Sequence, residues 1–218
     1  MIEVRPMTQR DLPGVVAIHR AAFPNFFLSF LGPRFLRVFY GFIVSEGIGI
    51  VALADGKVDG FVAGVSEPRL FYRRLMRRRF VGLALAITPV VLRHPSTLAR
   101  VTRRARQRTS VDPGDRRPGT DDRSSVPVEN HELNGAELMS LAVDPGQEHR
   151  GIGRALVAAF AERVAANGER RLWLTTDAAD NDRVIHFYES QGFLRSREFV
   201  TAEGRAMVEL TRDVGPQS

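Results

Sequence analysis

The order of apolar and polar positions predicts that strands and helices alternate along the chain. A short strand is expected at Ile2–Val4, followed by a helix over Gln9–Ala22. Thr8 and Asp11 have the spacing of a capping box, which marks the start of that helix. A second helix is expected from Pro33, because proline suits the first helical turn and the following apolar residues share one stripe.

The next elements are strands. Ile48–Ala54 and Lys57–Val65 are rich in β-forming residues and flank Asp55-Gly56, which is typical of a two-residue hairpin turn. Further strands are expected at Leu138–Val143, Arg171–Thr175, Phe193–Phe199 and Arg205–Leu210, with helices after Gly151 and from Asn181 or Asp182 to Ser190. The order favours one α/β domain over 1–218.

Residues 66–130 interrupt this alternation. Arg69–Arg108 holds twelve arginines and no acidic residue, so it carries +12 of a chain whose net charge is +6. Its centre, Phe80–Leu92, is apolar but too short to span a bilayer, which takes about 20 residues. Residues 109–130 are rich in Pro, Gly, Ser and Asp and predict a loop. We expect 66–130 to be a basic helical insertion between strands 3 and 4.

Composition narrows the chemistry. The chain has no cysteine, so disulfides, thiolate zinc sites and cysteine nucleophiles are excluded. No group of residues has metal-ligand spacing, and we expect no metal. Its N-terminus has no apolar signal region, which favours a cytoplasmic protein. The arginines of the insertion are interleaved with aliphatic residues, and no base-reading motif accompanies them, so we do not expect a nucleic-acid partner.

The stretch 137–156, ELMSLAVDPGQEHRGIGRAL, has the elements of an anion site. An apolar strand ends at the turn Asp144-Pro145-Gly146, and a helix then begins at Gly151 and Gly153. Free N–H groups at a helix N-terminus bind phosphate, and glycine allows the close approach of backbone to ligand. A dinucleotide fingerprint is disfavoured, because Leu156 stands where that motif has Gly or Ala.

A second motif follows about thirty residues later in NDRVIHFYESQGF, with Asn181, Tyr188, Gly192 and Phe193. Together with Val143, Pro145, Gly151 and Gly153, it resembles the two motifs of the GNAT superfamily of N-acetyltransferases. The resemblance covers residues 1–65 and 133–212 and implies a mixed, mostly antiparallel sheet of six or seven strands flanked by helices. It also implies direct transfer of an acetyl group from acetyl-CoA to a primary amine.

The resemblance assigns roles to individual residues. Tyr188 is expected to protonate the leaving thiolate; the alternative is a core aromatic. Glu137 is a candidate general base, or else an exposed glutamate that opens a strand. An unbroken strand would put 137, 139, 141 and 143 on one face, whereas a bulge would change this. The donor-binding residues implied are Leu141, Ala142, Val143, Glu148, His149, Arg150, Gly151, Ile152, Gly153, Arg154 and Asn181.

One residue departs from the family pattern. Glu148 occupies a position where the family prefers Gln or Arg, and a carboxylate there would repel a pyrophosphate unless its side chain turns to solvent. Arg150 and Arg154 could compensate for it. Weaker candidates for the site are Asp177, His131, Glu132 and His186.

The acceptor is not determined by the sequence. A small amine or an amino sugar is the first hypothesis and a protein or peptide amine the second. The alternative of another class is a non-catalytic acyl-CoA-binding or membrane-peripheral module, with contact through residues 69–108. A lid that packs on the domain is the favoured role of the insertion. The sequence leaves monomer and homodimer open.

Overall fold

The computed structural model describes residues 2–24, 26–78, 82, 135–201 and 204–215. Seven strands form a single sheet in the order β1-β2-β3-β4-β5-β7-β6. The strands are β1 (Glu3–Pro6), β2 (Ile48–Ala54), β3 (Lys57–Val65), β4 (Ala136–Val143), β5 (Arg171–Asp177), β6 (Leu194–Val200) and β7 (Ala206–Asp213). Only β4 and β5 pair in parallel, so the predicted mostly antiparallel sheet is confirmed.

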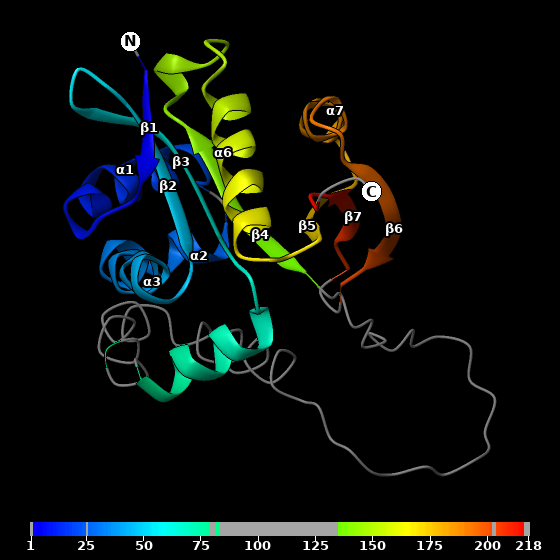
Figure 1. The fold of residues 1–218 in the computed structure, drawn as a ribbon, viewed down its shortest axis with the longest axis horizontal. Helices are drawn as coiled ribbons and strands as arrows, with labels where there is room; N and C mark the ends of the chain where they lie inside the picture. Colours follow the sequence, from blue (N-terminus) through cyan, green and yellow to red (C-terminus); the bar gives the residue numbers. More distant parts are fainter. Residues whose placement is uncertain (1, 25, 79–81, 83–134, 202–203, 216–218) are drawn as a thin grey trace.

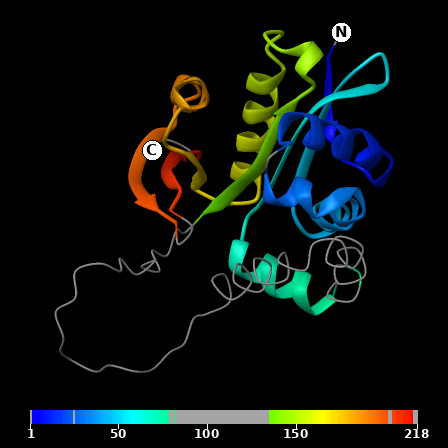
Figure 2. The ribbon, with the colours of Figure 1, turned by 180° about the vertical axis from the view of Figure 1, so that it is seen from behind.

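Helices cover both faces of this sheet. The helical elements are η1 (Gln9–Asp11), α1 (Leu12–Ala22), α2 (Phe27–Phe30), α3 (Gly32–Glu46), η2 (Pro145–Gln147), α6 (Ile152–Ala166) and α7 (Asp182–Ser190). Figures 1 and 2, which view the molecule from opposite sides, show α1 and α3 on one face and α6 on the other. Two apolar clusters result, one under α1 and α3 and one under α6 and α7.

The first helix starts as its capping box predicts. The backbone N–H of Thr8 donates to the Asp11 carboxylate at 2.7 Å, and the Thr8 hydroxyl donates to the same oxygen at 2.8 Å. Arg5 adds two hydrogen bonds of 2.8 Å to this carboxylate. The Arg5 guanidinium therefore lowers the pKa of Asp11 to about 2, although burial opposes the shift. The first turn is a 3-10 helix, and the α-helix begins at Leu12.

The start of the predicted insertion is helical over 68–78. Phe71 and Leu75 are buried in the cluster under α1 and α3, while Arg74 and Arg78 form ion pairs with Glu46 at the end of α3. The remainder of the insertion, including the loop expected at 109–130, lies outside the described residues, and its role as a lid stays a prediction. Among the helices of the described chain, none is long and apolar enough to cross a membrane.

Candidate functional site

The sheet divides between its two central strands. β4 and β5 pair only at Ala136↔Leu172 and Glu137↔Trp173. From Leu138 to Val143, the edge of β4 that faces β5 has no strand partner in the described chain. Figure 1 shows the two strands diverging from this junction. An unpaired strand edge presents free N–H and C=O groups, so this edge can bind an extended molecule that carries amides.

A β-bulge in β4 sets the direction of its side chains. Ala63 pairs with Ser140 and Gly64 with Leu138, which leaves Met139 as the extra residue. Leu138 and Leu141 consequently pack in the same cluster, under α6 and α7, whereas Met139 packs under α1 and α3. Of the two possibilities that the sequence left open, the structure has the bulge, and 137, 139, 141 and 143 do not share one face. Because its neighbours Ala136 and Leu138 pack under α6, Glu137 lies on the face of α1 and α3.

The loop after β4 leads into the N-terminus of α6. The Asp144 carboxylate accepts a hydrogen bond of 3.0 Å from the Gly146 N–H and shapes the turn. Gly151 is the N-cap of α6 at φ 78° and offers no capping side chain. The N–H groups of Ile152, Gly153 and Arg154 thus have no intrahelical acceptor and point out of the helix end. These donors and the helix dipole fit a phosphate group.

The two sequence motifs meet in space at this loop. A Cβ on Gly153 would lie 3.4 Å from Cζ of Phe187, an ordinary van der Waals distance, so the start of α6 packs beside the Phe187 ring of α7. Glu148 and Arg183, which are 35 residues apart, form an ion pair of 3.3 Å. The Arg183 guanidinium also lies 3.4 Å from Nε2 of His149, whose φ is 64°. The structure therefore brings together the glycine loop and the helix of the second motif.

Two other expected donor ligands have different environments. The Asn181 amide donates to the Thr176 hydroxyl at 2.8 Å and to the Asp177 carbonyl at 2.9 Å, and its main-chain carbonyl starts α7. Asn181 thus fixes the β5–α7 connection, and only its side-chain oxygen is left to accept from a ligand. The Arg150 side chain donates to Gln147 within the loop. Binding of the donor by either residue stays a prediction.

Tyr188 lies on the buried side of α7. Its ring contacts Phe187 and Phe193 edge-on, with centroids 5.2 and 5.4 Å away. Burial raises the pKa of the Tyr188 phenol, which therefore stays protonated at neutral pH. Ile185 is buried beside it, whereas Val184 is exposed. An ordinary tyrosine is also protonated at neutral pH, and the raised pKa makes this phenol a weaker proton donor, so the burial and packing agree with the core-aromatic alternative as well as with a general acid.

Charged and aromatic side chains gather at the end of β5, on the face away from α7. Arg205 forms hydrogen bonds of 2.6 and 2.7 Å with the two carboxylate oxygens of Asp177. The same guanidinium lies 5.6 Å from the ring centroid of Phe26, which is 45% exposed and precedes α2. These contacts join three segments that are distant in sequence. Asp177, a weaker candidate from the sequence, is part of this cluster.

A second ion pair between an arginine and a carboxylate lies on the same face of the sheet. Glu209 of β7 is 2% exposed and accepts a hydrogen bond of 3.1 Å from Nε of Arg197 in β6. Arg197 in turn lies 5.1 Å from the ring centroid of Phe199. The burial of Glu209 could not be recognised from the sequence, because its partner Arg197 belongs to another strand.

A buried polar network behind β4 was also missed. His19 of α1 and Tyr40 of α3 are buried, and Nδ1 of His19 lies 2.7 Å from the Tyr40 hydroxyl. Burial raises the pKa of Tyr40, an effect that a hydrogen bond with Ser140 of β4 opposes. Burial also lowers the pKa of His19 to about 4, so its ring is neutral at physiological pH. The network braces β4 next to its bulge.

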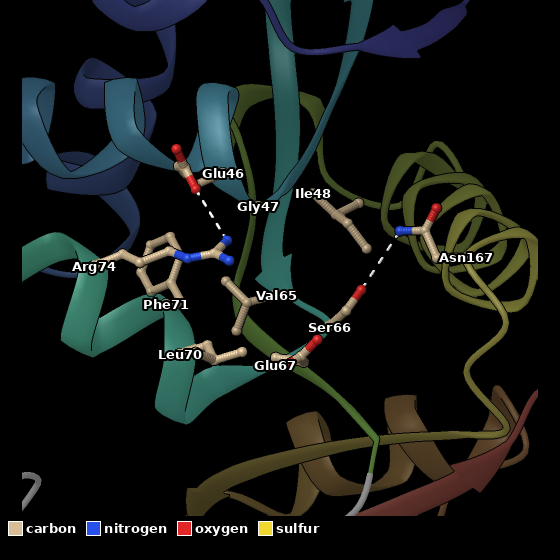
Figure 3. A pocket seen from close by; sticks show the side chains of 10 residues that line it. All are labelled: Glu46, Gly47, Ile48, Val65, Ser66, Glu67, Leu70, Phe71, Arg74 and Asn167. Atoms are coloured by element: carbon tan, nitrogen blue, oxygen red, sulfur yellow. Dashed lines mark hydrogen bonds and ion pairs between the residues drawn. The ribbon is translucent and has the colours of Figure 1, made fainter.

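A small pocket lies away from these residues. It measures about 140 Å³ and is found where the ends of α3, β3 and α6 meet the helical segment 68–78. Figure 3 shows Arg74 directed toward Glu46, and Asn167 toward Ser66 across the opening. Asn167 ends α6 at its C-terminus, so this pocket is remote from the glycine loop. The geometry of the strand edge and the loop is the better guide to the site.

His131 and Glu132 lie outside the described residues, and His186 is exposed on α7. Within the described residues, no group of three His, Asp or Glu side chains could hold a metal ion.

Comparison with known proteins defines the class. The sequence model described as the acetyltransferase (GNAT) family matches residues 121–193, which run from the end of the insertion through both motifs. The solved structure of the ribosomal-protein-S18-alanine N-acetyltransferase from Escherichia coli aligns with a TM-score of 0.56 and 17% identity, covering 100% of this chain and 97% of that one. Residues 121–193 thus carry a GNAT-family sequence, and the molecule has the GNAT fold.

Two curated relatives are similar over shorter stretches. The bS18-alanine N-acetyltransferase of Escherichia coli (strain K12) is 36% identical over 77 residues, which are 34% of this chain and 51% of that protein. The mycothiol acetyltransferase of Kocuria rhizophila is 42% identical over 59 residues, 27% of this chain and 19% of that protein. The chain therefore spans about half the length of the bS18-alanine relative and less of the other.

Proposed function

We propose that this protein is an acetyl-CoA-dependent N-acetyltransferase that acts on a primary amine. The observation that carries the proposal is the meeting of the glycine loop with α7, through the close approach of Gly153 to Phe187 and the contact of Glu148 with Arg183. This junction lies at the end of β4 from which the unpaired strand edge runs down to Glu137. The match of residues 121–193 to the acetyltransferase (GNAT) family model, which spans both motifs, supports the proposal.

The residues present fit the donor. The N–H groups of residues 152–154 would hold its pyrophosphate at the positive end of α6. The free edge of β4 at Leu141, Ala142 and Val143 would pair with the amides of the pantetheine arm, as an added strand does. Acetyl-CoA supplies the reactive thioester when bound. All other tasks fall to the side chains around the divided strands.

The transfer moves one acetyl group and two protons. The acceptor nitrogen forms a bond to the acetyl carbon while the carbon–sulfur bond breaks. Tyr188 would donate a proton to the departing sulfur, a role that its position in the second motif supports. Glu137, on the opposite face of β4, would take the proton that the amine loses. Transfer is direct, and no covalent link to the protein forms.

Two classes of acceptor follow from the relatives. A small amine or amino sugar is the first candidate, and one matched relative is named a mycothiol acetyltransferase. The α-amine of a protein is the second candidate, favoured by similarity to bS18-alanine N-acetyltransferases. Either class would approach the face that carries Glu137, Asp177 and Arg205.

Isotope-labelled acetyl-CoA tests the proposal. The protein is incubated with a metabolite extract in one arm and with a library of peptides with free N-termini in the other, and mass spectrometry detects labelled products. We expect labelled amides in one arm, and their loss with heat-inactivated protein. Absence of labelled product and of any measurable acetyl-CoA binding would refute the function.

A further inference from the structure

The ion pair between Glu148 and Arg183 explains how a carboxylate is tolerated beside the phosphate loop. Glu148 stands where the family pattern prefers Gln or Arg, and its side chain does not extend freely into solvent. It is paired at 3.3 Å with Arg183 in the first turn of α7, and it lies 3.8 Å from Nε2 of His149. Its charge is therefore compensated by the Arg183 guanidinium beside the same loop.

The ion pair is weak enough for a phosphate to replace Glu148 as the partner of Arg183. The side chains of Arg183 and Glu148 are 75% and 46% exposed, and Arg183 makes one hydrogen bond to the carboxylate rather than a two-fold one. Exposed ion pairs of this kind contribute little to stability. Arginine forms stronger, charge-assisted bonds with phosphate, which it can engage through two N–H groups at once. A phosphate at the loop would compete well for this guanidinium.

We infer that Arg183 is a phosphate-binding residue that Glu148 holds in place until the donor displaces it. The inference rests on the proposed function and names a ligand for the donor's phosphates that is not among the matched positions of either motif. On donor binding, the guanidinium transfers from Glu148 to a phosphate, and the carboxylate turns to solvent. Because Arg183 is two residues beyond Asn181 and on the helix of Tyr188, the exchange links the phosphate loop to α7.

Binding measurements test this without recourse to activity. Calorimetric titration of the full chain with coenzyme A gives the Kd of the wild type and of Arg183→Ala, Glu148→Gln and the double variant. We expect Arg183→Ala to weaken binding by about tenfold or more, as the loss of a charge-assisted bond does. Glu148→Gln keeps the side-chain size and removes the repulsion, so it should tighten binding by about threefold or more. The double variant should fall between the two.

A matched control lies at the other end of the same helix. Arg195 of β6 pairs with Glu189 near the C-terminus of α7 at 2.8 Å, in an exposed ion pair remote from the loop. Arg195→Ala should bind coenzyme A within twofold of wild type. A steeper fall of affinity with salt in wild type than in Arg183→Ala is also expected, because the variant lacks one phosphate contact. Thermal melting of each variant verifies that it is folded.

Titration with 3′-dephospho-coenzyme A distinguishes the phosphates. If Arg183→Ala costs as much with this ligand as with coenzyme A, the residue binds the pyrophosphate; if the cost vanishes, it binds the 3′-phosphate. Both results support the inference. It is overturned if folded Arg183→Ala binds as wild type does, or if Glu148→Gln weakens binding as much as Arg183→Ala. Failure of the wild type to bind coenzyme A would instead refute the proposed function.

Discussion

Gly64→Ala is expected to destabilise the protein strongly. Gly64 lies in β3 opposite the bulge of β4, and a Cβ there would be 2.1 Å from the carbonyl oxygen of Glu137 and 2.4 Å from Cζ of Phe160. The first contact is with backbone, so no change of side-chain rotamer relieves it. Strand or helix must move by about 1 Å, since carbon and oxygen ordinarily stay more than 3 Å apart.

The cost can be estimated from overpacked cores, where added groups destabilise by about 1–3 kcal/mol and occasionally more. We take about 3 kcal/mol, because both sides of the new methyl group are obstructed. A chain of this size loses roughly 2–4 °C in Tm for each kcal/mol, which gives a fall of about 6–12 °C. Circular dichroism during heating, with urea unfolding at 25 °C, measures it.

Gly41→Ala is the matched control. Gly41 lies within α3, and its Cβ would first meet Oε1 of Gln9 at 3.4 Å, the flexible end of a side chain. Alanine is favoured over glycine inside a helix by about 0.5–1 kcal/mol, so Tm should stay the same or rise. The reasoning about close strand contact is refuted if Gly64→Ala melts within about 1 °C of wild type, or if the fall in Tm is the same for both variants.

Four further predictions concern chemistry and pH. Tyr188→Phe should lower kcat by about 10²-fold or more at saturating acetyl-CoA with an unchanged fold, and wild-type turnover would remove the acid assignment. Asp177→Asn breaks the pair with Arg205 and should raise the acceptor KM more than the acetyl-CoA KM, whereas an equal effect on both would contradict an acceptor role. Stability should fall as pH drops from about 6.5 toward 4, because unfolded His19 gains a proton that the buried ring resists; His19→Gln should flatten that part of the unfolding curve. Between about pH 4 and 2 a second loss follows as Asp11 is protonated, worth about 2 kcal/mol at most, and Asp11→Asn should remove this second step alone.

Local patterns were sufficient to predict most elements. The capping box at Thr8 and Asp11 and the Asp55-Gly56 turn both formed, the latter with φ of 51° and 76°. Both depend on residues within four positions of one another, which a sequence displays directly. The differences lie at element ends, such as β5, which continues to Asp177, and in the short helices α2 and η2, which were not predicted.

Features that depend on register or on distant partners could not be predicted. The sequence left a bulge in β4 open as an alternative but could not place it, because its position at Met139 follows from the pairing of β4 with β3 and burial along β4 still alternates through it. The ion pair of Glu148 and Arg183 and the contact of His19 with Tyr40 join residues from different elements. Each of these residues resembles an ordinary helical or loop residue when it is considered alone.

The division between β4 and β5 has a consequence for the order in which the molecule opens. Residues 171–213 form three strands and a helix whose backbone pairing with the rest of the sheet is limited to two residue pairs. Cooperative units of unfolding follow such boundaries, so amide hydrogen exchange in β6 and β7 should proceed through sub-global opening that leaves β1–β4 protected. The apolar cluster under α6 and α7 is shared by both parts and limits how freely this unit separates. A ligand that bridges the divided strands would join the two units into one and slow exchange on both sides.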